Sequence, residues 1–358
     1  MRRRMLALVL SGTLLGACTA TPAGSPTSAP TARPAGTAAR PAAGKPAASP
    51  TKLKVSQPVS SLTFVTVYVG RHQGFYADEG LEVEQLATGG GGPDIQALVS
   101  GDVQLAITPG TGQMDAFKQG RRLLAVFNAL DKNIINVAMR TDVAQQKGIT
   151  AQSPLDDKLK ALKGLKVAGT RPGALTFQQA EALVRRAGLE PQKDVEIVGA
   201  GEGPALIAAL ESGQVDVILQ SVPVPEQVVA RGKAIMLINN AAGEDPSIVP
   251  FNMASVLVTP EYADKNPDVV KRFVRASRKA NEWIRQATPE QIADAVSPDL
   301  GQTPREVLVA GAAAVKTATN PTGILDKQAV KNMVEMTQSG VDVEELYGLF
   351  TDRYLKGD

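Results

Sequence analysis

The chain has very few of the side chains that carry metal, redox or nucleophilic chemistry. Its 358 residues include one cysteine, Cys18, and one histidine, His72. A single cysteine excludes a disulfide within the chain and a cysteine-based zinc site. A lone histidine with no cysteine beside it excludes a Cys–His pair. We therefore expect no catalytic residue, no metal and no cofactor.

Clustered positive charge is also lacking in the part of the chain that we expect to fold. Six of the 38 basic residues and none of the 36 acidic ones precede residue 52, so the rest of the chain is mildly acidic. Aromatic residues make up only 4% of the chain, and no basic stripe is interleaved with them. Binding to a phosphate backbone needs such clusters. We therefore expect no nucleic-acid partner.

A hydrophobic run long enough to span a bilayer is missing from the N-terminal segment. Residues 1–17 place three arginines before an apolar run that is typical of a secretory signal peptide. The segment ends Leu15-Gly16-Ala17-Cys18, which resembles a bacterial lipobox, where the cysteine is lipidated and becomes the mature N-terminus. The alternative is a chance cysteine beside an ordinary cleavage site.

The next segment, residues 18–51, is dominated by alanine, proline, threonine, serine and glycine. It has too little apolar bulk to offset the entropy lost on ordering, which predicts a disordered tether after the lipidated Cys18. Together, lipid and tether predict an extracytoplasmic protein anchored to a bacterial membrane, in the periplasm or on the cell surface. Several acyl chains would hold such a protein, whereas one binds only marginally.

A short unit of the form Ala-Leu-x-Ser-Gly-x-Val-x occurs twice, at residues 97–107 and at residues 209–219. Its pattern predicts the end of a helix, a left-handed glycine that stops it, and a short buried strand. Two similar αβ units so far apart predict two similar α/β lobes. Two lobes enclose a cleft, which indicates a protein that closes around a ligand.

From Lys52 onward, predicted strands alternate with predicted helices. The main strands are expected at residues 52–57, 81–86, 123–128, 134–139, 164–169, 194–198 and 253–258, and the main helices at residues 64–73, 174–187, 204–212, 225–230 and 267–286. This alternation predicts mostly parallel sheets with ligands outside the carboxyl ends of the strands. We assign residues 52–140 and 254–358 to lobe I and residues 141–253 to lobe II, joined by two crossover strands near residues 136–142 and 253–259.

Four stretches carry a resemblance to a known family. They are residues 74–83 (GFYADEGLEV), 97–107, 162–169 and 260–273. The chain resembles the substrate-binding proteins of the nitrate, sulfonate, taurine and thiamine-precursor importers (SsuA/ThiY-like, NMT1-like). The resemblance implies a type II periplasmic-binding-protein fold with two doubly wound α/β lobes. It also implies a monomer that captures a small molecule between its lobes for an ABC permease and its ATPase.

Four loops that follow strands are the candidate ligand-binding elements. We predict ligand contacts from Ser60, Ser61, Phe64, Thr108, Gly110, Thr111, Thr170, Arg171, Gly173, Gln220 and Ser221. Hydroxyls and glycines at helix starts can bind an anionic group, but they also serve as ordinary helix caps. Arg171 is the one cation in these loops and could hold a sulfonate or carboxylate, or be a solvated loop residue. The glycine run at residues 89–92 lacks a phosphate-loop ending and is interpreted as a flexible loop.

The ligand predicted from these loops is a small anion or a compact organic acid, but three alternatives stay open. Phe64, Tyr68 and Tyr76 could supply a ring for a pyrimidine precursor. A sensory ligand-binding protein would have the same cleft. An enzyme related to thiamine-pyrimidine synthase is less well supported, because that enzyme consumes an active-site histidine and uses a cysteine-rich motif, and this chain has one residue of each kind.

Overall fold

The computed structural model describes residues 49–356. The predicted signal peptide, the lipidation site Cys18 and all but the end of the predicted tether lie outside these residues. The tether was expected to run to residue 51, but Thr51 is already the first residue of a strand. No helix among residues 49–356 is long and apolar enough to cross a membrane.

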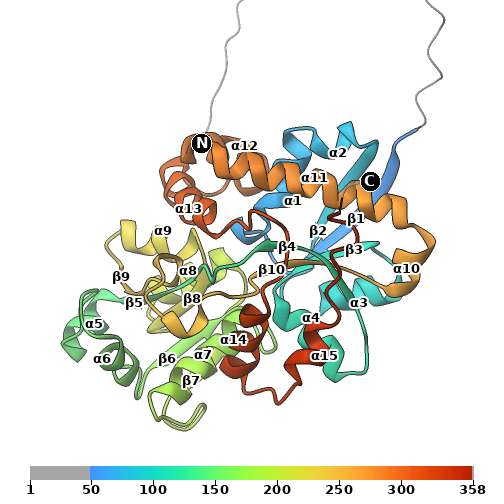
Figure 1. The fold of residues 1–358 in the computed structure, drawn as a ribbon. Coiled ribbons are helices and arrows are strands. Elements are labelled where there is room, and N and C mark those ends of the chain that lie inside the picture. Colours follow the sequence, from blue (N-terminus) through green and yellow to red (C-terminus); the bar gives the residue numbers. More distant parts are fainter. Residues whose placement is uncertain (1–48, 357–358) are drawn as a thin grey trace, which may run out of the picture. The chain divides into compact units, whose positions relative to one another are not determined.

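Lobe I is built on a sheet with the strand order β2-β1-β3-β10-β4 (Figure 1). Its strands are β1 (Thr51–Gln57), β2 (Leu81–Ala87), β3 (Leu105–Thr108), β4 (Leu124–Leu130) and β10 (Ala254–Val258). The first three are parallel, whereas β10 runs antiparallel to β3 and β4. Its helices include α1 (Val65–His72), preceded by the 3-10 turn η1 (Leu62–Phe64), α2 (Phe75–Asp78), α3 (Pro93–Ser100) and α4 (Gly110–Lys118).

Lobe II repeats this arrangement with the strand order β7-β6-β8-β5-β9. Its strands are β5 (Ile135–Arg140), β6 (Lys166–Gly169), β7 (Glu196–Gly199), β8 (Val217–Ser221) and β9 (Ala234–Ile238). Here β6, β7 and β8 are parallel, and β5 is antiparallel to β8 and β9. Its helices are α5 (Thr141–Lys147), α6 (Leu155–Lys160), α7 (Leu175–Arg186), α8 (Gly203–Glu211) and α9 (Val224–Ala230).

The remaining helices follow β10. They are α10 (Pro260–Lys265), α11 (Pro267–Gln286), α12 (Pro289–Leu300), α13 (Arg305–Ala318), α14 (Lys327–Thr337) and α15 (Val343–Tyr347). The apolar side chains of α11 from Val270 to Ile284, which recur at helical spacing, are buried. The ring of Phe273 on this helix stacks on Tyr76 of α2, with ring centroids 4.8 Å apart. Packing of this kind places α11 over the lobe I helices α1 and α2.

The fourth strand of each sheet arrives from the other lobe. β5 enters the lobe II sheet directly after β4, and β10 enters the lobe I sheet after β9. Four of the five strands in each sheet run in the same direction, as predicted, but both sheets are mixed because the arriving strand runs against its two neighbours. The chain changes sheet at residues 131–134, whereas the sequence suggested a change of lobe after residue 140. We propose that the lobes divide at residues 131–134 and 239–253.

The repeated unit lies at the same place in both lobes. After α3, Gly101 has a φ of 84°, and after α8, Gly213 has a φ of 75°. In each case the chain then enters the third strand of its sheet, β3 or β8, beside the arriving strand. The predicted two-lobed α/β fold with two crossover strands is thus confirmed.

Candidate functional site

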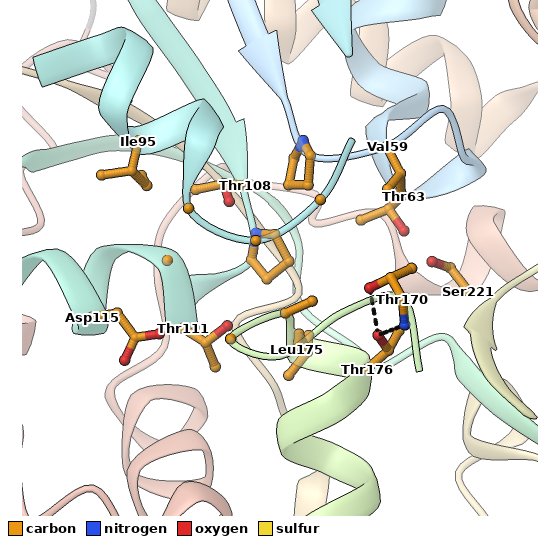
Figure 2. A pocket seen from close by; sticks show the side chains of 18 of the residues that line it. Val59, Thr63, Ile95, Thr108, Thr111, Asp115, Thr170, Leu175, Thr176 and Ser221 are labelled. Carbon is orange, nitrogen blue, oxygen red and sulfur yellow. Dashed lines mark hydrogen bonds between the residues drawn. The ribbon is translucent and has the colours of Figure 1, made fainter. Parts of the chain in front are cut away.

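A cavity of about 490 Å³ lies between the two lobes at the carboxyl ends of their strands. Its lining comes from the loops that follow β1, β3, β6 and β8, which are the four loops that the sequence indicated. Figure 2 shows Val59, Thr108 and Thr111 of lobe I around the same space as Thr170, Leu175 and Ser221 of lobe II. A ligand in this cavity would contact both lobes at once.

Most of the predicted ligand contacts line this cavity. Those that do are Ser61, Phe64, Thr108, Thr111, Thr170, Gly173, Gln220 and Ser221. Ser60 is exposed and lies outside the lining. Gly110 also lies outside it, because its N–H donates to the Asn252 carbonyl at 3.0 Å and the residue packs against that side chain. Contact of these residues with a ligand is still a prediction.

Arg171, the predicted anion-binding cation, is not among the lining residues. Its Nη2 donates to the backbone carbonyl of Thr88 in lobe I at 3.3 Å. The side chain lies against Gly89 and Gly90, and its buried Nε has no partner within the part of the chain that the structure describes. Arg171 therefore connects the lobes beside the cavity, a role that neither prediction for this residue included.

Two helices begin at the cavity. Thr111 lies in the first turn of α4, and Thr176 lies in the first turn of α7. The first N–H groups of a helix have no partner within the helix and form the positive end of its dipole. Such helix starts favour an anionic or hydrogen-bond-accepting ligand group.

Several hydroxyls that line the cavity also have structural partners. Thr176 Oγ1 accepts a hydrogen bond from the Thr170 N–H at 2.9 Å, and the two threonine hydroxyls lie 2.8 Å apart (Figure 2). Ser61 Oγ accepts from the Thr63 N–H at 3.3 Å as the cap of η1. Ser221 Oγ donates to Gln220 Oε1 at 3.1 Å. Capping and cavity lining are thus properties of the same side chains, because a hydroxyl can donate and accept at the same time.

The glycine run at residues 89–92 has a second function that its flexible-loop interpretation missed. Gly90, Gly91 and Gly92 line the cavity. A Cβ on Gly91 would lie 2.7 Å from the backbone nitrogen of Ala174 in lobe II. Only glycine permits this approach of two backbones. The sequence could have indicated this role, because the run follows β2 and so lies at the carboxyl ends of the parallel strands β1 and β2.

Asp115 is another lining residue that the loop-based prediction missed. It lies one turn after Thr111 on α4, so both side chains face the cavity (Figure 2). Its Oδ2 accepts a hydrogen bond from Gln178 Nε2 of α7 in lobe II at 3.0 Å. Burial raises the pKa of the Asp115 carboxyl, and the hydrogen bond from Gln178 opposes this shift. The spacing of residues 111 and 115 was the available signal, once the start of α4 is known.

Of the three aromatic residues considered for ring stacking, only Phe64 lines the cavity. Tyr68 Oη accepts a hydrogen bond from Gln57 Nε2 at 2.7 Å, and burial raises its pKa to about 12. Tyr76 is buried against Phe273, as described above. The remaining apolar lining includes Pro58, Val59, Ile95, Ile135, Leu175 and Met253. Within residues 49–356, no group of three or more His, Cys, Asp or Glu side chains is placed to hold a metal ion.

A known family and a curated protein match this chain. The model of a family described as NMT1/THI5 like matches residues 61–292. The Bacillus subtilis (strain 168) protein named "Putative binding protein YtlA" is 24% identical over 258 residues, which are 72% of this chain and 73% of that protein.

The solved structures that are similar to this one include two binding proteins. The periplasmic nitrate-binding protein NrtA from Synechocystis PCC 6803 has a TM-score of 0.69 at 16% identity, covering 85% of this chain and 87% of its own. The alkanesulfonate-binding protein SsuA from Xanthomonas axonopodis pv. citri, bound to MOPS, has a TM-score of 0.64 at 16% identity, and the match covers 85% of this chain and 99% of that protein's chain. At these identities the likeness shows the fold, which is that of periplasmic binding proteins.

Proposed function

Because the chain belongs to the NMT1/THI5-like family, we propose that it is the extracytoplasmic solute-binding component of an ABC importer. The observation that carries the proposal is the cavity of about 490 Å³ between the carboxyl ends of two sheets that share one strand order. A cleft at this position is where open α/β sheets bind ligands. The lobes close on a solute there and present it to a permease and its ATPase.

The proposed solute is a small organic acid. Its acidic group lies at the starts of α4 and α7, near Thr111 and Thr176, where the positive ends of the helix dipoles favour negative charge. Its carbon skeleton contacts the apolar lining, which includes Val59, Ile95 and Leu175. The size of the cavity and this apolar lining favour an organic acid over a bare inorganic anion.

A thermal-shift screen of sulfonates, carboxylates, nitrate and pyrimidines tests this function. A ligand at 100 times its dissociation constant stabilises the folded chain by about 2.7 kcal/mol, which is a visible shift. If only sugars or inorganic cations stabilise the protein, the proposed ligand class is wrong. A pyrimidine precursor is the second candidate, favoured by Phe64 in the lining, and the same screen separates it from the acids.

We also propose that the chain acts as a receptor and not as an enzyme. The lining that the structure describes contains one carboxylate, Asp115, and neither histidine nor cysteine, so it lacks a Ser–His or Cys–His pair. Incubation with the solutes that bind, followed by a search for products, tests this part. Recovery of the solute unchanged is expected, and turnover would contradict it.

The proposed receptor is a monomer held to the membrane through a lipid on Cys18. The signal-like residues 1–17 and the proline-rich segment that follows support this part of the proposal. Expression of the full chain in a bacterial host should place it in the membrane fraction, and mass spectrometry should find acyl chains at Cys18. The variant Cys18→Ser should leave the membrane fraction while keeping ligand binding. Unchanged membrane association of Cys18→Ser would contradict the anchor.

A further inference from the structure

Asp115 is the one acidic side chain among the described residues that line the cavity, and Lys118 is the one basic side chain. Lys118 is exposed, whereas Asp115 is half-buried. The two residues lie on α4, and Lys118 partly offsets the raised pKa of the Asp115 carboxyl. The charge of Asp115 therefore dominates the inner part of the lining.

The carboxylate of Asp115 has one oxygen engaged and one available. Oδ2 accepts the hydrogen bond from Gln178 Nε2 at 3.0 Å. Within residues 49–356 no donor is bonded to Oδ1. A half-buried carboxylate with a single neutral donor is poorly compensated for the water that it has lost. A donor supplied by the ligand would restore that compensation, and a charged donor would do so most strongly.

Gln178 of lobe II links Asp115 to the contact between the lobes. Its Nε2 donates to Asp115 in lobe I and lies 3.4 Å from the Gly173 carbonyl in its own lobe. Its Oε1 is buried and has no partner in the described part of the chain. The side chain is therefore held through Nε2 alone, and its bond across the cleft depends on the carboxylate of Asp115.

We propose that Asp115 is a specificity residue that selects solutes carrying an amino group or a comparable N–H donor. This proposal rests on the function proposed above. The amino group of the bound solute donates to Asp115 Oδ1, at the inner turn of α4, while its acidic group lies at the helix starts. A second acidic group placed at Asp115 is rejected, because two like charges would then meet in a partly dry site. The preferred solutes are therefore amino acids in the broad sense, with an acid at one end and an amine at the other.

Matched ligand pairs that differ only in the amino group test this proposal. We suggest 3-aminopropane-1-sulfonate against propane-1-sulfonate and 4-aminobutyrate against butyrate, measured by titration calorimetry on the full chain. In the unaltered protein the amine-bearing member of a pair should bind about 10- to 100-fold tighter, the range expected for a hydrogen bond to a charged group. In Asp115→Asn this preference should fall to about threefold or less, with the affinity for the amine-free member nearly unchanged.

Two further variants separate a specific effect from a structural one. Asp115→Glu keeps a carboxylate and should retain a preference for the amine. Glu226→Gln is the matched control, because Glu226 is also half-buried, burial also raises the pKa of its carboxyl, the Asn136 amide donates to it at 2.7 Å, and it lies outside the cavity lining. This control should keep the full preference.

The outcomes distinguish this proposal from the receptor function. If amine-free members bind the unaltered protein as well as or better than their partners, the receptor function stands and the role of Asp115 is wrong. An unchanged preference in Asp115→Asn would overturn it too. If none of the four probes binds, the amine proposal fails, and the receptor function fails with it only if the wider solute screen also finds no ligand.

Discussion

At the residue scale, Glu79 is the carboxylate whose surroundings predict a measurable effect on stability. Its side chain is only 8% exposed and accepts hydrogen bonds from Arg275 Nε at 2.9 Å and Lys279 Nζ at 3.0 Å. The hydrogen bond from Arg275 is the largest cause that lowers the pKa of the Glu79 carboxyl. Because α11 supplies both partners, this contact ties the turn after α2 to the long helix.

We predict that Glu79→Gln lowers the free energy of unfolding by about 1–3 kcal/mol at pH 7, the range for a buried hydrogen bond to a charged group. A folded-state pKa below the unfolded value gives stability that is present above the unfolded pKa, about 4.3 for glutamate. That stability is lost as the pH falls through the folded-state pKa. The difference between the two proteins in urea unfolding should therefore shrink below about pH 4.

Glu82→Gln is the control for this prediction. Glu82 forms an exposed ion pair with Lys52, with an N–O distance of 3.8 Å, and such pairs contribute less than about 1 kcal/mol. A loss in Glu79→Gln no larger than in Glu82→Gln would contradict the prediction, as would a loss that does not depend on pH.

Single residues also show how far sequence reasoning reaches into the site. Thr108, Thr170 and Ser221 could be placed at the cavity because each follows a recognisable buried strand. Arg171 also follows such a strand, but its side chain turns to the Thr88 carbonyl of the other lobe. The direction of a loop side chain depends on contacts with a distant segment, which local sequence patterns do not encode. Asp115 was missed for a related reason, since the prediction considered the loops and the starts of the helices that follow them, and Asp115 lies one turn further into α4.

At the scale of elements, the glycine loop after β2 is predicted to control closure. Gly91→Ala would bring a Cβ to 2.7 Å from the Ala174 nitrogen, which lies in the other lobe and in the backbone. The lobes must then separate slightly, so we predict that ligand affinity falls at least about tenfold. Unfolding stability should change little, because alanine has no steric penalty at Gly91 other than this contact between the lobes.

Gly92→Ala is the matched variant for this loop. Gly92 has a φ of 101°, so alanine is strained there by about 1–3 kcal/mol, but no atom lies within 4 Å of the added Cβ. It should therefore lower stability more than Gly91→Ala and ligand affinity less. Calorimetry with a solute found in the screen measures both variants, and the reverse order would show that local backbone strain, not closure, governs binding.

Most elements were predictable because their hydrophobic periods are clear. The boundaries of β1, α7 and α11 differ from the predicted ones by one residue or less at each end. The antiparallel direction of β5 and β10 was not predictable, because the continuous run of apolar residues in a buried strand does not depend on the direction in which the strand pairs. The short elements α5, α6 and β9 were missed, since few residues give little periodicity.

At the scale of the whole molecule, three contacts between the lobes surround one cavity. They are the Gln178–Asp115 hydrogen bond, the Arg171–Thr88 hydrogen bond and the backbone approach at Gly91. Within residues 49–356, two chain segments carry the chain from one sheet to the other, residues 131–134 and residues 239–253. Because so few segments connect the lobes, the contacts across the cleft depend on how closely the two lobes approach each other. Two of the three are single hydrogen bonds and the third is a backbone approach, so they suit an arrangement that a bound solute stabilises and that its release reverses.

This arrangement predicts different outcomes for the two polar contacts. Arg171 lies outside the lining, so Arg171→Ala should weaken binding of the amine-bearing and amine-free probes by the same factor. Asp115→Asn should instead change the ratio of the affinities for the two probes. Small-angle scattering of Arg171→Ala without solute should show a larger radius of gyration than the unaltered chain, because one closing contact is gone. Arg121→Ala removes an exposed arginine outside the lining and should change neither quantity. If Arg171→Ala instead weakens the acidic probes and leaves unchanged the affinity for a solute without an acidic group, such as a pyrimidine that binds in the screen, Arg171 binds the acidic group directly.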